Sequence, residues 1–209
     1  MTEQRVIVTL AKEVEGDFIW SQLENLTLMY SAGPLAVKFA YFGEEASRTS
    51  RPLMSTRYAS DPEDWRALLD HARERCVCGC YTHIDDALTA ALKEAEESHV
   101  AAVVIFGDHF SGNLDEALER ARQLHAAGTR IFVFEEAINK AAGDRALKAL
   151  AKAGGGSYIA YNPNVEKLAG RLPRFFEAIG HYALGVSDAL AALGDQSASL
   201  LLEQIGPAR

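Results

Sequence analysis

Three cysteines stand at alternate positions in one short stretch of the chain, and a histidine follows them closely. If the stretch is extended, Cys76, Cys78 and Cys80 point in one direction, with His83 nearby. Thiolates and imidazole suit Zn²⁺ or Cu⁺, and exposed thiols also serve as redox sensors. Against metal binding, structural zinc sites usually use Cys-x-x-Cys pairs, and free cysteines are often buried packing residues. The cluster leaves two interpretations open, a metal or redox site and a set of packing residues.

A second group of side chains offers carboxylate and hydroxyl oxygens, the ligands of hard cations such as Mg²⁺ and Mn²⁺. Its members, with one neighbouring histidine, are Glu13, Glu15, Asp17, Thr82, Asp108 and His109. Most of these residues also have a purely structural interpretation. The three acids of the first loop would favour the N-terminus of the following helix, Thr82 would be a helix N-cap, and Asp108 would cap the turn after its strand.

Apolar runs of strand length alternate with amphipathic stretches of helical length along the chain. This alternation is typical of a mainly parallel sheet with helices on both faces. We therefore predict a Rossmann-like α/β fold with a central sheet of about six strands, of which the edge strand beside Pro52 is antiparallel. The predicted strands are residues 5–10, 36–42, 52–58, 100–106, 130–134 and 157–161. The predicted helices are residues 18–31, 61–75, 82–98, 114–127, 144–152 and 165–193.

The predicted strands decide where the oxygen-bearing side chains meet. In an open α/β sheet, ligands bind outside the carboxyl ends of the strands, where neighbouring loops converge. The three acids follow the first strand, while Asp108 and His109 follow the most apolar one. We therefore expect both sets at one edge of the sheet, beside the start of the helix that contains Thr82.

Several segments resemble von Willebrand factor A-type (VWA) domains. Residues 82–88 are similar to that family's Thr-x-Ile-x-x-Ala-Leu. Residues 102–108 resemble its strand that ends in Thr-Asp-Gly, with Gly107 in place of the threonine and His109 in place of the glycine. Residues 124–134 resemble the family's helix-Gly-strand unit, and residues 150–158 its Ala-x-x-Gly-Gly-x-Tyr segment. Within the family, the resemblance is to uncharacterised bacterial single-domain members.

The resemblance implies a metal-adhesion site, but the first loop departs from the family's pattern. VWA domains hold Mg²⁺ or Mn²⁺ with an Asp-x-Ser-x-Ser loop, a threonine and an aspartate, and Thr82 and Asp108 match the last two. Glu13, Glu15 and Asp17 stand where the loop has Asp, Ser and Ser. Three carboxylates beside Asp108 would repel an acidic group on a partner, although a hard cation could relieve that repulsion. We therefore expect an altered site that does not require a metal.

The resemblance also implies a non-enzymatic interaction module that serves as an adaptor or an assembly factor. The expected partner-binding surface comprises Glu13, Asp17, Thr82, Asp108 and His109, and family analogy suggests an AAA-type ATPase complex as partner. The sequence has no Gly-x-Ser-x-Gly elbow and no Gly-x-x-x-x-Gly-Lys-Ser/Thr phosphate loop, so we expect no enzyme. The alternative is a metal-binding or redox-sensing protein that uses the cysteine cluster.

Composition and chain length bear on the class of partner, the cellular location and the number of domains. The net charge is -8, with no cluster of Lys and Arg, which argues against nucleic acid and anionic membranes as partners. No signal peptide is recognisable, and no apolar stretch approaches the roughly 20 residues that span a bilayer, so we expect a cytoplasmic protein. We assign residues 1–195 to one domain. Residues 196–209 form an apolar tail that either packs on the domain or binds a partner.

Overall fold

A six-stranded sheet forms the centre of the protein, in the strand order β3-β2-β1-β4-β5-β6. The structure is a computed structural model that describes residues 4–11, 25–42, 53–75, 83–136, 144–161 and 172–185. The strands are β1 Gln4–Ala11, β2 Leu35–Phe42, β3 Leu53–Ser55, β4 Val100–Gly107, β5 Arg130–Glu136 and β6 Tyr158–Tyr161. All neighbouring pairs are parallel except β2 with β3, so the prediction of an antiparallel edge strand is confirmed.

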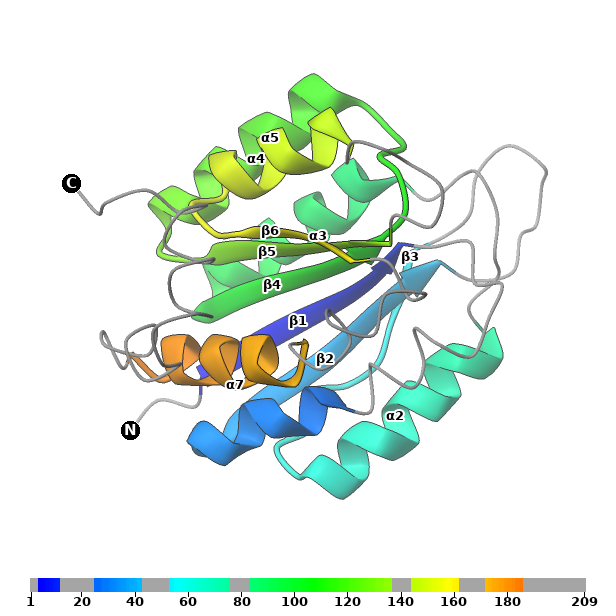
Figure 1. The fold of residues 1–209 in the computed structure, drawn as a ribbon, viewed down its shortest axis with the longest axis vertical. Helices are drawn as coiled ribbons and strands as arrows, with labels where there is room; N and C mark the ends of the chain where they lie inside the picture. Colours follow the sequence, from blue (N-terminus) through cyan, green and yellow to red (C-terminus); the bar gives the residue numbers. More distant parts are fainter. Residues whose placement is uncertain are drawn as a thin grey trace.

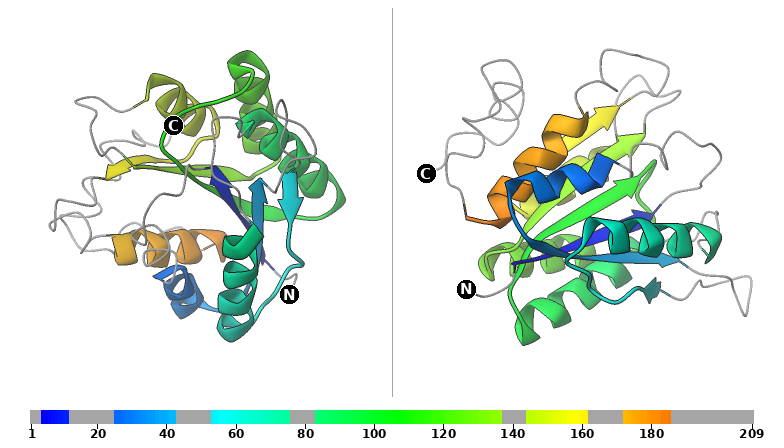
Figure 2. Two further views of the ribbon diagram at one scale, coloured as in Figure 1. Left: turned by 90° about the vertical axis from the view of Figure 1, so that its right-hand side faces the viewer. Right: turned by 90° about the horizontal axis from the view of Figure 1, so that it is seen from below.

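Helices cover both faces of this sheet, as predicted (Figure 1). They are the 3₁₀-helix η1 Asn25–Ala32 and the α-helices α2 Pro62–Arg75, α3 Ile84–Glu97, α4 Leu114–Ala126, α5 Arg145–Ala153 and α7 Leu172–Ala183. The buried side chains of η1, α2 and α7 belong to one core and those of α3, α4 and α5 to the other. Figure 2 shows the same two layers, with η1 beside α7. Within the described residues, no helix combines the length and the apolar character needed to cross a membrane.

The two cores hold β4 and β5 rigidly between them. All eight residues of β4 are buried, because helices cover both of its sides. On the α7 side, the rings of Phe106 and Phe134 stack with their centroids 5.0 Å apart, and the ring of Phe176 lies 5.3 Å from that of Phe134. On the other side, the helices contribute mainly aliphatic side chains. The loops that leave the carboxyl ends of β4 and β5 therefore start from fixed points.

The edge strand and the first helix differ from the predictions. β3 is three residues long, because the hydroxyl of Thr56 enters the ladder and accepts from the Phe39 N–H at 3.0 Å. Pairing then resumes as a single bridge between Val37 and Ala59. The described part of the first helix is η1 and not an α-helix, and residues 18–24 lie outside the described residues.

Three further boundaries were predicted wrongly. α3 begins at Ile84 with His83 in the N-cap position, so Thr82 is not the N-cap of this helix. The first N–H of α3 is satisfied by the loop after β4, since the Ile84 N–H donates to the Ser111 carbonyl at 3.1 Å. α7 ends at Ala183 and does not continue to residue 193, because Gly185 turns the chain with a φ of +77°. β5 extends past residue 134 and includes two acids.

Candidate functional site

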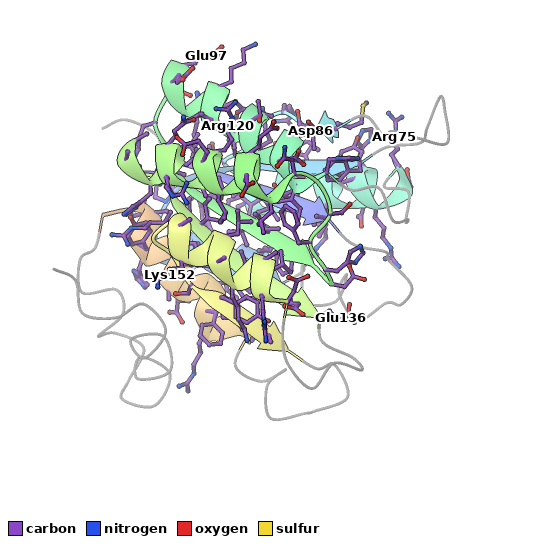
Figure 3. All side chains as sticks on the ribbon, turned by 90° about the horizontal axis from the view of Figure 1, so that it is seen from above. Arg75, Asp86, Glu97, Arg120, Glu136 and Lys152 are labelled. Atoms are coloured by element: carbon purple, nitrogen blue, oxygen red, sulfur yellow. The ribbon has the colours of Figure 1, made fainter. Side chains whose placement is uncertain are left out.

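The carboxyl edge of the sheet gathers acids from several elements. Asp86 at the start of α3 and Glu136 at the end of β5 lie at this edge, whereas Lys152 at the end of α5 lies at the other (Figure 3). At the centre of the edge is the loop of residues 108–113, which follows β4 and precedes α4. Since this loop carries Asp108 and His109, it contains the described part of the predicted partner-binding surface.

Asp108 and His109 form a pair at the start of this loop. The Asp108 Oδ1 and the His109 Nδ1 are 2.8 Å apart, and 27% and 34% of the two side chains are exposed. β4 ends at Gly107, so the pair stands directly outside the carboxyl end of the central strand. This partly exposed pair can bind another molecule, because the carboxylate can accept hydrogen bonds and the imidazole can donate them.

Asp85 fixes the far end of the loop to α3. Its Oδ2 accepts from the Asn113 N–H at 3.2 Å. Gly112 lies against the other oxygen with a φ of +116°, and a Cβ at that position would be 2.0 Å from the Asp85 Oδ1. Only glycine combines this backbone conformation with so close an approach. The contact therefore depends on the identity of both residues.

Asp144 fixes the near end of the loop to α5. Its Oδ2 accepts from the Phe110 N–H at 2.9 Å. Its Oδ1 is the N-cap of α5 and accepts from the N–H groups of Ala146 at 2.7 Å and Leu147 at 3.3 Å. One carboxylate thus joins the start of a helix to the loop after the central strand.

Glu135, near the end of β5, holds the backbone of Asp144 in place. Its side chain is fully buried, and its Oε2 accepts from the Asp144 N–H at 2.7 Å and from the Tyr158 hydroxyl. Burial, the hydrogen bond to Glu135 and the negative charges of Glu135 and Asp144 raise the pKa of Tyr158 above its ordinary value. Tyr158 therefore keeps its proton in alkaline solution in which an ordinary tyrosine would ionise, and it remains a donor to Glu135 there.

The predicted site residues fall partly inside and partly outside the described residues. Glu13, Glu15, Asp17, Thr82 and the three cysteines Cys76, Cys78 and Cys80 lie outside the described residues. His83 is described, and its Nδ1 lies 3.8 Å from the Asp85 Oδ1, too far for a hydrogen bond. The structure thus places the start of α3 beside the loop that carries the adjacent residues Asp108 and His109, and this is the part of the predicted arrangement that it describes.

The described residues do not by themselves fit a metal ion. Of the predicted ligands of a hard cation they include only Asp108, whose Oδ1 already lies at hydrogen-bond distance from His109. Among the described part of the chain, no three His, Cys, Asp or Glu side chains are grouped closely enough to hold a cation. Among the described residues, the site is therefore held together by hydrogen bonds between protein groups.

The sequence predictions missed the residues that support the site. Glu135, Asp144 and Tyr158 were not among the candidates, because the apolar pattern ends at residue 134 and gives no reason to continue the strand. A signal was present, however. Two acids directly after an apolar run, at the edge of the sheet where Asp108 was expected, are candidates for buried and partnered carboxylates.

Comparisons with known proteins agree with this architecture. No protein-family model and no curated protein matches the sequence. Among solved structures, the chain is similar to the SpRpn10 VWA domain with a TM-score of 0.59 and 14% identity, over 87% of this chain and 98% of that one. It is also similar to the conserved hypothetical protein BatB from Bacteroides thetaiotaomicron with a TM-score of 0.57 and 14% identity, over 84% of this chain and 98% of that one.

A third similar structure holds a metal. Proximal thread matrix protein 1 from the mussel byssus, with zinc in its MIDAS motif, matches with a TM-score of 0.54 and 13% identity, over 82% of this chain and 45% of that one. At such low identities the likeness establishes the fold and not the chemistry of the site. The chain has the fold of VWA domains, as its sequence predicted.

Proposed function

We propose that the chain is a non-enzymatic interaction module that binds a protein partner at the carboxyl edge of its sheet. The observation that carries this proposal is the partly exposed Asp108–His109 pair on a loop that Asp85 and Asp144 hold from both sides. A contact group that is held in place before binding loses little conformational entropy when the partner arrives. The VWA-like fold, which the sequence resemblance links to interaction modules, supports the same proposal.

The proposed surface extends beyond the described residues. Glu13 and Asp17 follow β1 in the sequence and Thr82 precedes α3, and both strand β1 and helix α3 border β4 or its loop. We place these residues around the Asp108–His109 pair and assign the partner to a protein complex, with an AAA-type ATPase complex in the cytoplasm as the candidate from family analogy. No metal is required for this binding in our proposal.

Site-directed crosslinking tests the proposed surface. A photoreactive residue replaces His109 in one full-length variant and Glu119, an exposed residue midway along α4, in a matched control. After irradiation in cells, we expect one discrete crosslinked protein from position 109 and not from position 119. We also expect Asp108→Ala in the position-109 variant to reduce that product at least fivefold. Equal products from both positions, or no effect of Asp108→Ala, would refute the proposal.

A further inference from the structure

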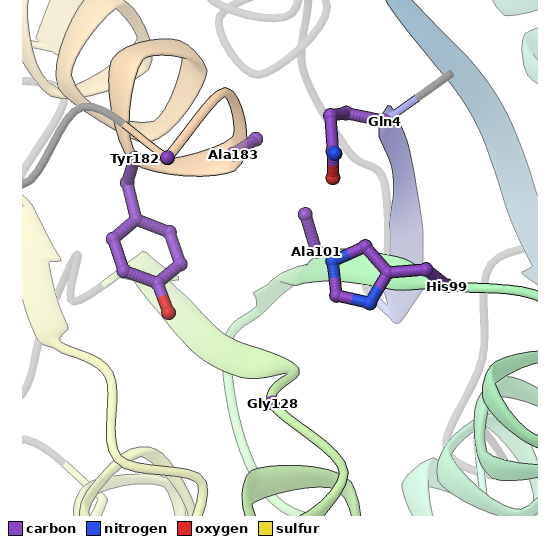
Figure 4. Close-up of a pocket in the computed structure, with 7 residues that line it drawn as sticks. Gln4, His99, Ala101, Gly128, Tyr182 and Ala183 are labelled. Carbon is purple, nitrogen blue, oxygen red and sulfur yellow. The ribbon is translucent and has the colours of Figure 1, made fainter. Parts of the chain in front are cut away.

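A pocket of about 330 Å³ lies at the opposite edge of the sheet from the candidate site. It opens between the starts of β1 and β4, the turn that precedes β5 and the C-terminal end of α7 (Figure 4). The residues that line it are Gln4, His99, Ala101, Gly128, Tyr182, Ala183 and Gly185. Because four of these are glycine or alanine, main chain and small side chains form much of its wall.

One wall of the pocket is held rigidly. The Arg130 Nε donates to the Tyr182 hydroxyl at 2.9 Å, and the Arg130 guanidinium also lies 5.4 Å from the centroid of the Tyr182 ring. The same arginine donates to the Gly155 carbonyl. Since Arg130 begins β5, it ties the last turn of α7 to the sheet. The pocket therefore has a fixed aromatic side that does not need a ligand to order it.

Another wall carries a polar atom that lacks a partner. The side chain of Gln4 is directed into the space between α7 and Ala101 (Figure 4). Its Oε1 is buried and has no hydrogen-bond partner among the residues that the structure describes. Buried acceptors in folded proteins are nearly always satisfied by a donor. An occupant suited to this pocket therefore combines an apolar group with an N–H donor, as a peptide segment does.

We infer that this pocket binds the chain's own C-terminal segment, with a leucine of residues 200–202 in the pocket and a main-chain N–H of that segment donating to Gln4. The described chain ends at Gly185, which itself lines the pocket, and residues 186–209 follow from there. A linker of about 15 residues has a root-mean-square span of about 20 Å, so Leu200, Leu201 and Leu202 can return to their point of departure. Tethering at this distance gives an effective concentration of about millimolar, which favours the tail over a free ligand or a second copy.

Nuclear magnetic resonance of the full-length chain tests this inference. The test variant carries Leu200→Ser, Leu201→Ser and Leu202→Ser, and the matched control carries Leu190→Ser and Leu193→Ser in the same segment. We expect the ring signals of His99 and Tyr182 to shift in the test variant and not in the control. The Trp65 indole signal, from the buried side chain of α2, reports whether each variant is folded. Unchanged His99 and Tyr182 signals in a folded test variant, or equal shifts in both variants, would overturn the inference.

Limited proteolysis of the wild-type chain gives an answer that does not depend on the variants. Thermolysin cleaves beside leucine, so its rate at residues 200–202 is compared with its rate on a synthetic peptide of residues 194–209. If the segment is bound in the pocket, cleavage of the full chain is at least tenfold slower and independent of protein concentration. Equal rates overturn the inference, as does protection that grows with concentration, which would place the segment in a second copy.

Discussion

Asp85 and Asp144 hold the same loop from opposite sides. Asp85 accepts from the N–H of Asn113 at one end, and Asp144 accepts from the N–H of Phe110 at the other. The two acids stand at the starts of α3 and α5, which lie on either side of α4 in the same helical layer. The loop that presents Asp108 and His109 is therefore positioned by two helices to which it is not directly connected.

Replacing Asp144 should loosen the loop and α5 together. Asp144→Ala removes the acceptor for Phe110 and the N-cap of α5, and a lost N-cap alone costs about 1–2 kcal/mol of unfolding free energy. Asp144→Asn keeps one acceptor oxygen, which can retain the N-cap, but its NH2 group cannot accept from the Phe110 N–H, so this variant should retain only part of the stability. Urea unfolding measures the cost, and hydrogen exchange of the Phe110 and Leu147 amides separates the two contacts. If only the Leu147 amide loses protection, Asp144 does not position the loop.

A comparison of two glycines separates backbone strain from the contact with Asp85. Gly112 and Gly185 both have positive φ, but only at Gly112 would a Cβ meet another atom, the Asp85 Oδ1, whereas at Gly185 nothing lies within 4 Å. Gly185→Ala should therefore cost only the backbone strain of about 1–2 kcal/mol. Gly112→Ala adds overpacking and should cost about 2–4 kcal/mol in urea unfolding. Equal losses would mean that Asp85 moves aside freely and does not fix the loop.

The alternation of apolar and amphipathic segments was sufficient to predict the sheet. β1 and β4 are nearly continuous apolar runs, because both faces are covered, and their positions follow directly from hydrophobicity. The residues around the site are different. Phe110 and Asp144 are 34 positions apart, and only the packing of α5 beside the loop brings them together. No local pattern in the sequence could reveal this contact.

Helix boundaries failed for a related reason. The amphipathic pattern continues past α7, yet the helix ends where Gly185 adopts positive φ, and its last turn is set by tertiary contacts of Tyr182 with Arg130. Thr82 has the chemistry of an N-cap, but the carbonyl of Ser111 receives the first N–H of α3 and the helix begins later. Local propensity was outweighed in both places by contacts with distant parts of the chain.

A second partly buried tyrosine, Tyr58, makes the free energy of unfolding depend on pH in alkaline solution. The Tyr58 hydroxyl donates to the Glu94 Oε2 at 2.7 Å, and Lys38 donates to the Glu94 Oε1 at 2.6 Å. Burial first, and then the hydrogen bond and the charge of Glu94, raise the pKa of Tyr58 above its ordinary value, despite an opposing effect of Arg5. The folded state therefore keeps a proton that the unfolded chain releases above about pH 10.

The sign of this pH dependence follows directly. A group whose pKa is raised by folding contributes its full stability below its unfolded pKa and loses it as the pH rises above that value. The unfolding free energy of the wild type should thus begin to fall at about pH 10 and keep falling as the pH rises toward the raised pKa of the folded state, and that of Tyr58→Phe should fall less steeply. Tyr158, whose pKa is also raised, retains part of the slope, and a double Phe variant should be flatter still. Parallel urea-midpoint curves for all three proteins would contradict this prediction.

Metal removal distinguishes a metal-free interaction module from the two alternatives that the sequence left open, a cation at the altered adhesion site and a metal or redox sensor at the cysteine cluster. In our proposal binding at the carboxyl edge requires no metal, so EDTA-stripped protein should melt at the same temperature as untreated protein, and Mg²⁺ or Mn²⁺ should not raise the midpoint. A ligand that binds only the folded state raises the midpoint by mass action. The melts are therefore repeated with Asp108→Ala and with Cys76, Cys78 and Cys80 all changed to Ser. A rise with Mg²⁺ that Asp108→Ala abolishes would mean that the altered adhesion site still binds a cation. A rise with Zn²⁺ that only the cysteine variant abolishes would instead favour the metal or redox sensor.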